Sequence, residues 1–304
     1  MDRREFLKQV SMWSAGLSIT VPHFTIISEA LAAQRQAPVI AYAKGKDYAA
    51  LVSQILDSLG GMEKFVKSGN TVVIKPNIGW DRNPDQAANT HPLIVKALVE
   101  HALDAGAKEV KVFDRTCNEA RRCYVNSGVQ DILKTIKSNR VTFFHPDERK
   151  YIPVDISKGQ AARRLEIYKD ALEADSYINV PIAKHHSLST LTLGMKNSMG
   201  VLGGKRGDMH HDLGQKIADL ATIVRPTLTV IDATRILLRN GPQGGNLNDV
   251  KVLDTIIAST DPVAIDAYAT TFFEMKPGDI PSTVAAYKHG LGEMDLAKIK
   301  IIKT

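Results

Sequence analysis

Residues 179–207 read NVPIAKHHSLSTLTLGMKNSMGVLGGKRG, and the interpretation of the whole chain starts from this stretch. It opens as the end of an apolar run, breaks at Pro181, and then gathers lysines, histidines and five glycines, four of them in residues 200–207. A strand that gives way to such residues is typical of the edge at which an α/β protein binds its ligand. The stretch therefore predicts a site that begins where a strand ends.

Strand and helix patterns alternate on both sides of this stretch. Apolar, β-branched runs predict strands, and apolar residues three or four positions apart predict helices. The predicted strands are residues 39–42, 71–75, 109–113, 141–145, 176–180, 227–231, 252–258 and 299–302. The predicted helices are residues 47–59, 92–105, 161–174, 211–224 and 262–273. This alternation predicts an α/β fold, with a mostly parallel sheet and helices on both faces in a three-layer, Rossmann-like arrangement. Without an internal repeat or a linker, residues 33–304 are expected to form a single domain.

Polar side chains follow the predicted strands at the points where they end. They are Lys75 and Asn77, Asp114 to Thr116, His145, Lys184 to His186, Asp232 and Thr234, and Thr260 and Asp261. One such residue is usually a turn former. Because parallel strands bring their carboxyl ends to one edge of the sheet, the whole set is expected to converge on one crevice.

The residue types in this crevice suggest two kinds of role. The candidate catalytic residues, which could move a proton, are Lys184, His186 and Asp114. The candidate cofactor- and ligand-binding residues are Lys75, Asn77, Lys196, Asn197 and Gly200. Lys184, Lys196 and Lys205, with the backbone amides of residues 200–207, suit an anion, although neither G-x-x-x-x-G-K-[ST] nor G-x-G-x-x-G is present. The glycines have the alternative role of a flexible lid.

Two pairs of adjacent histidines are candidate metal ligands, namely His185 with His186 and His210 with His211. Neighbouring residues of a strand face opposite ways, so one member of each pair is expected to point into a site. One histidine from each pair, together with Asp114 or Asp232, would form a nitrogen and oxygen site that suits a first-row metal ion. Because no fixed spacing such as H-E-x-x-H occurs, the alternative is that all are surface histidines.

The chain has two cysteines, Cys117 and Cys123, six residues apart. An oxidising compartment favours a disulfide between them, which predicts close Cα atoms. The alternatives are a pair of metal or cluster ligands, for which the spacing is unusual, and two free thiols.

The N-terminus carries a twin-arginine export signature in residues 2–8, DRREFLK. A moderately apolar segment, residues 10–27, follows, and Ala30-Leu31-Ala32 forms a small-x-small cleavage site. Polar residues and Pro22 make this segment a poor membrane span. Residues 1–32 are therefore predicted to be a signal peptide read by the twin-arginine export machinery. The mature protein, cut near Ala33, is predicted to be periplasmic without a stable membrane span.

The formal net charge of the chain is +6. This mild excess is compatible with a small anionic ligand. It is scattered and accompanies no nucleic-acid-binding module, so no role in nucleic-acid binding is expected.

Several short motifs of this chain occur together in one known family. They are Lys75-Pro-Asn77 after an apolar strand, His91-Pro92 at a helix start, Pro181-x-x-Lys184-x-His186, Met195-Lys-Asn197 with Gly200, and Thr260-Asp-Pro262-Val-Ala-x-Asp266. This set, from Val72 to Tyr268, resembles the family of the domain of unknown function 362 (DUF362). The resemblance implies an association with iron–sulphur proteins, some of which carry an appended four-cysteine module. This chain has no such module, and two cysteines cannot supply the usual four thiolates, so an iron–sulphur cluster is not expected in this chain alone.

Two functions from different classes follow from these observations. One is an exported enzyme in which a metal or cofactor assists catalysis on an anionic substrate. The other is a non-catalytic periplasmic binding or redox-accessory protein.

Overall fold

The computed structural model describes residues 37–304, of which Pro38–Thr304 form a compact unit. The predicted signal peptide, residues 1–32, lies outside the described residues. Among the helices that are described, none is long and apolar enough to cross a membrane.

The described strands form one ten-stranded sheet and one two-stranded sheet. The strands are β1 (Val39–Lys44), β2 (Thr71–Pro76), β3 (Glu109–Val112), β4 (Val141–Phe143), β5 (Tyr151–Asp155), β6 (Arg164–Tyr168), β7 (Ser176–Val180), β8 (Ile182–His186), β9 (Thr190–Thr192), β10 (Leu228–Leu237), β11 (Val250–Ser259) and β12 (Lys300–Lys303). The α-helices are α3 (Tyr48–Ser58), α4 (Pro92–Asp104), α5 (Ala120–Asn126), α6 (Val129–Lys134), α7 (Lys169–Glu173), α8 (Gly194–Asn197), α9 (Leu213–Ile223), α10 (Pro262–Thr270) and α11 (Pro281–Lys288).

The large sheet is mixed but mostly parallel, as predicted. Its main path runs in the order β12-β1-β11-β10-β7-β2-β3-β4, with β8 beside β10 and β9 beside β8. The run from β10 through β7, β2 and β3 to β4 is parallel throughout. Strand β11 is antiparallel to both of its neighbours, β10 and β1. The carboxyl ends of β2, β3, β7 and β10 therefore share one edge, whereas that of β11 lies at the other.

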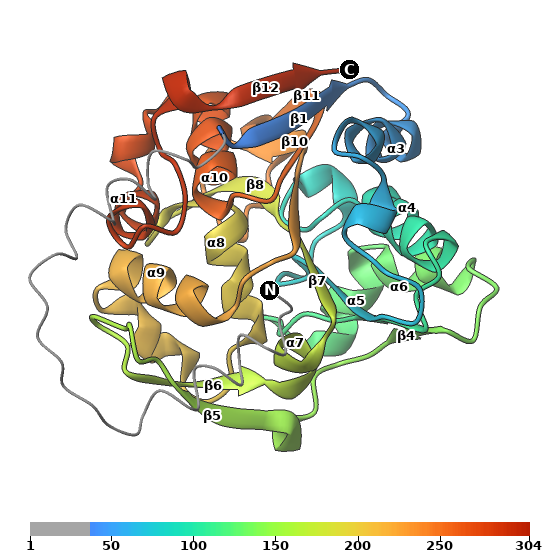
Figure 1. Ribbon diagram of the computed structural model, residues 1–304, viewed down its shortest axis with the longest axis horizontal. Coiled ribbons are helices and arrows are strands. Elements are labelled where there is room, and N and C mark those ends of the chain that lie inside the picture. Colours follow the sequence, from blue (N-terminus) through green and yellow to red (C-terminus); the bar gives the residue numbers. More distant parts are fainter. Residues whose placement is uncertain (1–36) are drawn as a thin grey trace, which may run out of the picture. The chain divides into compact units, whose positions relative to one another are not determined.

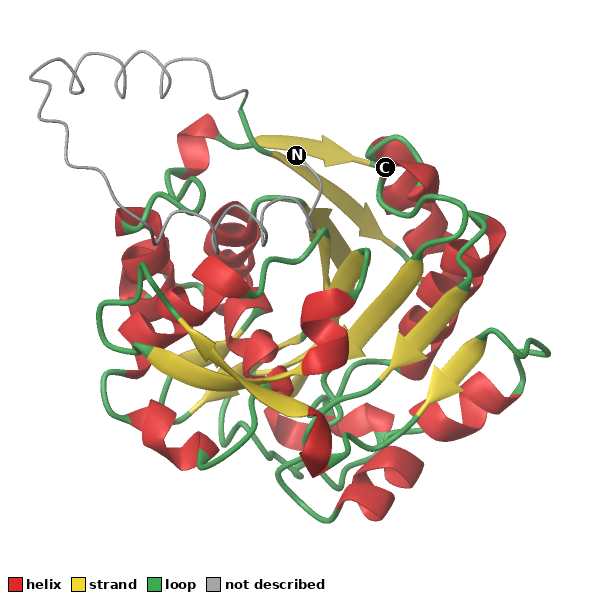
Figure 2. Ribbon diagram, turned by 60° about the horizontal axis from the view of Figure 1, so that its bottom comes forward, coloured by secondary structure: helices red, strands yellow, loops and turns green. Residues whose placement is uncertain are grey.

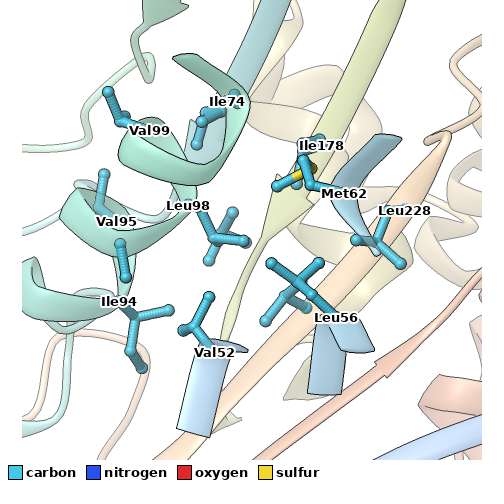
Figure 3. Close-up of a cluster of buried hydrophobic side chains, with 14 of the residues drawn as sticks. Val52, Leu56, Met62, Ile74, Ile94, Val95, Leu98, Val99, Ile178 and Leu228 are labelled. Atoms are coloured by element: carbon cyan, nitrogen blue, oxygen red, sulfur yellow. The ribbon is translucent and has the colours of Figure 1, made fainter. Parts of the chain in front are cut away.

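Helices cover both faces of this sheet, which confirms the predicted α/β architecture (Figures 1 and 2). Val72 and Ile74 of β2 pack on the face covered by α3 and α4, and Val73 between them packs on the opposite face. Figure 3 shows the first of these clusters, which includes Leu56 of α3, Leu98 of α4 and Ile74 of β2. Alternate residues of one strand thus build two separate cores, as the strand's two-residue period requires.

One predicted helix is wrong. Residues 161–174 were expected to be helical, but they form β6 and the short helix α7, and β6 pairs with β5 in the small antiparallel sheet. In Arg164-Leu-Glu-Ile-Tyr168 polar and apolar residues alternate, which is the period of a strand. Only the following segment, Lys169–Glu173, is helical, so the predicted helix began eight residues too early.

One strand, β10, continues past its predicted end, and another, β8, was not predicted. The chain resumes as β8 directly after Pro181, and β10 runs to Leu237, so Asp232 lies in mid-strand and not at a strand end. Asp232 is fully buried, and its carboxylate accepts a 2.8 Å hydrogen bond from the backbone N–H of His91 at the start of α4. Asp261, at the end of antiparallel β11, caps α10 at the opposite edge of the sheet. Neither aspartate belongs to the crevice.

Candidate functional site

A cavity of about 580 Å³ lies where β2, β3 and β8 end, beside α8 and the glycine-containing segment that follows it. The eight residues predicted to serve catalysis or cofactor binding all line it. They are Lys75, Asn77, Asp114, Lys184, His186, Lys196, Asn197 and Gly200. Residues 122 positions apart in the sequence therefore meet, because parallel strands deliver their carboxyl ends to one edge.

The floor of the cavity contains a buried ion pair. Nζ of Lys75 lies 2.8 Å from Oδ1 of Asp114, and the two residues are 1% and 2% exposed. Asp114 also accepts a 2.7 Å hydrogen bond from the backbone N–H of Ile78 through its other oxygen. Burial lowers the pKa of Lys75, and the neighbouring carboxylate opposes that shift. Each charge is thus buried with a partner, as buried charges need to be.

Asn197, at the end of α8, ties this pair to the surrounding elements. Its backbone oxygen accepts a 2.6 Å hydrogen bond from Nζ of Lys75, and its Oδ1 accepts from the same ammonium at 3.0 Å and from Nδ2 of Asn77 at 2.9 Å. Its own Nδ2 donates to Oδ1 of Asn179 at 2.8 Å. The side-chain amide of Asn197 is therefore a structural junction of the site, with little capacity left for a ligand.

Gly200 has a steric role. A Cβ atom added there would lie 1.9 Å from Oδ1 of Asp114 and 2.4 Å from Nζ of Lys75. Only a residue without a side chain lets the backbone approach the ion pair so closely. Gly200 is thus needed for packing on the pair, in addition to lining the cavity.

Lys184, on β8, is a buried lysine with neutral acceptors. Its Nζ donates to Oδ1 of Asn77 at 3.2 Å and to the backbone oxygen of Ala88, and it lies 5.9 Å from the ring centre of Trp80. Burial, together with the positive charge of the nearby Lys196, lowers its pKa to about 7. A lysine with this pKa exchanges its proton near neutral pH.

Lys196, on α8, is the cation with the fewest partners. Within residues 37–304 its Nζ makes no hydrogen bond and no ion pair, although the side chain lines the cavity. Burial lowers its pKa to about 8.

Asp266 fixes the start of α8, the helix that carries Lys196. Its buried carboxylate accepts hydrogen bonds from the N–H groups of Gly194 at 2.6 Å and Met195 at 3.0 Å.

His186 presents a neutral ring. Its Nδ1 accepts hydrogen bonds from the backbone N–H groups of Leu188 at 3.1 Å and Ser189 at 3.3 Å, so the ring's proton lies on Nε2. Burial, together with the positive charges of Lys196 and Lys184, lowers its pKa to about 3. With Nδ1 occupied and Nε2 protonated, this histidine can donate a hydrogen bond but is not arranged as a metal ligand or a general base.

The predicted set of histidine metal ligands does not assemble. His185 faces away from the cavity, and its Nδ1 accepts a hydrogen bond from the N–H of Gly241 at 3.1 Å. His210 lines the cavity, but His211 is exposed outside it. In the part of the chain that the structure describes, no three His, Cys, Asp or Glu side chains are grouped so as to hold a metal ion. The metal-ligand prediction is corrected because each histidine pair is split between different surroundings.

The two cysteines are free thiols, so the expected disulfide is absent from the structure. Cys117 lines the cavity, and its Sγ accepts a hydrogen bond from Arg206 at 3.1 Å. Cys123 is buried on α5, where its thiol lies 3.7 Å from the backbone oxygen of Gly79, and burial raises its pKa to about 11. A buried thiol and one exposed thiol do not fit an iron–sulphur cluster, which needs several accessible thiolates.

Among the lining residues that the sequence did not single out are Trp80 and Arg206, whereas Arg115 belongs to the predicted set of strand-end residues. Arg206 donates to the backbone oxygens of Arg115 at 2.8 Å and Thr116 at 2.9 Å, so it ties the glycine-containing segment to the loop after β3. The available signal for Arg206 was its position in residues 179–207, the stretch that predicts the site.

The cavity has a strong positive balance. Five lysine and arginine side chains line it, whereas Asp114 is the single carboxylate among its lining residues. Asp114 is already paired with Lys75, and Arg206 donates to neutral acceptors. A low-dielectric pocket with this excess favours an anion.

Residues 72–271 match the model of the domain of unknown function DUF362, which is more than half of the chain. This chain belongs to the DUF362 family. The match covers β2 to α10 and so contains every element that forms the cavity. Family membership was predicted from the motifs, and it is confirmed.

This DUF362 protein is similar to one curated relative and to two solved structures. A thylakoid-associated protein from Synechocystis is 29% identical over 245 residues, which are 78% of this chain and 73% of the relative. The lactate racemase apoprotein from Thermoanaerobacterium thermosaccharolyticum is 12% identical, with a TM-score of 0.46 over 85% of this chain. A protein from Thermotoga maritima with a solved crystal structure is 12% identical in sequence, with a TM-score of 0.45 over 81% of this chain. The DUF362 chain spans 60% of the length of each solved structure.

Proposed function

We propose that this DUF362 protein is exported by the twin-arginine route and binds a small, multiply charged anion in the cavity. The observation that carries the proposal is the charge balance, five lysines and arginines against one carboxylate that is already paired. Lys196 is the cation best placed for the ligand, because its Nζ has no partner in the described residues. Lys184 and the N–H of His186 supply further donors beside it.

Replacing Lys196 with methionine is expected to weaken sulfate binding about 10- to 100-fold, as expected for the loss of a hydrogen bond to a charged group. Isothermal titration calorimetry of the full chain measures the dissociation constant. The matched control is Lys205→Met, since Lys205 is an exposed lysine of the same glycine-containing segment and does not line the cavity. Equal affinities of the wild-type and Lys196→Met proteins would contradict the proposal.

The pH dependence of binding is a second readout of the same site. The pKa values of Lys184 and Lys196 are lowered to about 7 and about 8, so their ammonium groups lose protons as pH rises through this range. Sulfate keeps its charge throughout, so any change reports on the protein. Sulfate affinity should fall between pH 6 and pH 9, and binding should take up protons near pH 8. An unchanged affinity over this range would show that these two ammonium groups do not hold the anion.

Export has its own test, because the address lies in the N-terminal arginine pair. The double variant Arg3→Lys, Arg4→Lys is expected to remain in the cytoplasm, whereas the wild-type protein accumulates in the periplasm with a start near Ala33. Cell fractionation and N-terminal sequencing measure both properties. Arg35→Lys, a similar change outside the predicted signal, is the control. Normal periplasmic accumulation of the double variant would count against export by this route.

A second candidate function is proton transfer on the bound anion, and the surroundings of Lys184 favour it. As a neutral amine, Lys184 would donate its two protons to Asn77 and Ala88 and keep a lone pair free. Its pKa of about 7 suits both directions of transfer. An anion that co-purifies with the protein can be incubated with a sub-stoichiometric amount of the protein. This experiment distinguishes catalysis from binding alone. Conversion of most of the anion indicates catalysis, and recovery of all of it unchanged indicates binding alone.

A further inference from the structure

Part of the cavity's mouth is lined by apolar side chains, in contrast to its cationic floor. Three apolar side chains border it, each from a different segment: Trp80 after β2, Leu188 in the turn between β8 and β9, and Pro242 in the loop after β10. Leu188 is 58% exposed, and Trp80 and Pro242 are half-buried. Exposed apolar side chains gathered at the entrance of a pocket commonly contact the apolar part of a ligand.

These three residues are held in place by specific hydrogen bonds. The buried side chain of Asn89 accepts from the N–H of Trp80 at 3.1 Å and donates to its oxygen at 2.8 Å. The N–H of Leu188 donates to Nδ1 of His186. Pro242 is held in place through the loop that carries it.

That loop is fixed against the β8–β9 turn from both sides. The N–H of Gly241, next to Pro242, donates to Nδ1 of His185 at 3.1 Å, and the N–H of Ser187 donates to the oxygen of Gly241 at 3.3 Å. The adjacent histidines thus position the apolar mouth, one from each face of β8. A mouth ordered before the ligand arrives loses less entropy on binding than a mobile one.

Resting on the proposed anion binding, we propose that the cavity selects anions that carry an aromatic group. The charged head lies among Lys184, Lys196 and Arg206, and the aromatic ring contacts Trp80, Leu188 and Pro242. The indole of Trp80 offers a flat face on which an aromatic partner can stack, and Leu188 and Pro242 add apolar contact area. The ligand class is therefore an aromatic phosphate ester or an anion of the same shape and charge.

Phenyl phosphate and methyl phosphate test this proposal, because they share one head group and differ in the ring. Calorimetry of the full chain at pH 7 should give a dissociation constant at least about tenfold lower for phenyl phosphate, since the ring buries a large apolar area. In Leu188→Ser and in Trp80→Ala this preference should shrink several-fold. Leu247→Ser should keep the full preference, because Leu247 is 57% exposed, as Leu188 is, but lies outside the cavity.

The outcomes separate this inference from the function on which it rests. If neither ester binds and sulfate does not bind either, the proposed anion binding fails. If sulfate binds but neither ester does, anion binding stands and the aromatic preference is overturned. If both bind with the same affinity, anion binding stands and the aromatic preference is overturned. If phenyl phosphate binds more tightly but Leu188→Ser and Trp80→Ala keep the whole preference, the ring lies elsewhere and the assignment of the mouth is overturned. Thermal melting of each variant, compared with Leu247→Ser, shows whether a loss of affinity reflects loss of fold.

Discussion

Replacing Lys75 with methionine is expected to lower the free energy of unfolding by about 3–5 kcal/mol, the cost of leaving one member of a buried ion pair without its partner. Asp114 would keep its hydrogen bond from Ile78 but lose the ammonium 2.8 Å away, in a position that is 2% exposed. Asn197 would also lose two hydrogen bonds from the same ammonium. Urea unfolding of the full chain measures the change.

A surface ion pair of nearly equal length provides the control. Lys134 and Asp131 lie 3.0 Å apart with side chains 65% and 68% exposed, so Lys134→Met should change stability by less than about 1 kcal/mol. The double variant Lys75→Met, Asp114→Leu removes both buried charges and should recover part of the loss. A Lys75→Met protein as stable as the control variant would contradict the structural role of the pair.

The position of the site could be predicted from the sequence because it depends on topology. Strands that end in Lys75, Asp114 and the segment after Pro181 were recognisable from their apolar runs. Given parallel strands, their ends had to meet at one edge. The convergence of these strand ends follows from parallel pairing alone and does not depend on side-chain packing.

The direction of a strand could not be predicted in the same way. An apolar run such as that of β11 has the same pattern whichever way it runs, so Asp261 was placed at the wrong edge. Asp232 was misplaced because β10 continues beyond it without a turn signal. Strand direction and strand length depend on tertiary partners, which a local pattern does not contain.

The roles of the histidines required atomic contacts. As residue types, His185 and His186 suited a metal ion, but each ring nitrogen Nδ1 accepts a backbone hydrogen bond from a neighbouring loop. The donor to His186 lies in the adjacent turn, whereas the donor to His185 lies more than fifty residues further along the chain. The choice between ligand and structural support is made by these contacts, and the composition of the stretch does not reveal it.

Gly200→Ala is expected to be among the most damaging single substitutions in the cavity, although it adds one methyl group. The new Cβ would overlap Oδ1 of Asp114 at 1.9 Å and Nζ of Lys75 at 2.4 Å, both in buried positions. Overpacking a well-filled site costs about 1–3 kcal/mol, and separating the ion pair would add to that cost, so a loss of about 3 kcal/mol or more is expected. Sulfate binding should weaken as well, because α8 and Lys196 lie directly before Gly200.

Gly207→Ala is the matched control, because Gly207 lines the same cavity and a Cβ there would have no atom within 4 Å. Its stability should stay within about 1 kcal/mol of the wild type, or rise slightly through the lower entropy of the unfolded chain. If the glycines form a flexible lid, both substitutions should instead alter ligand affinity similarly and leave stability unchanged. A steric requirement at Gly200 predicts the opposite, a large loss of stability at one glycine and almost none at the other. Urea unfolding of the two variants therefore distinguishes a packed wall from a mobile cover.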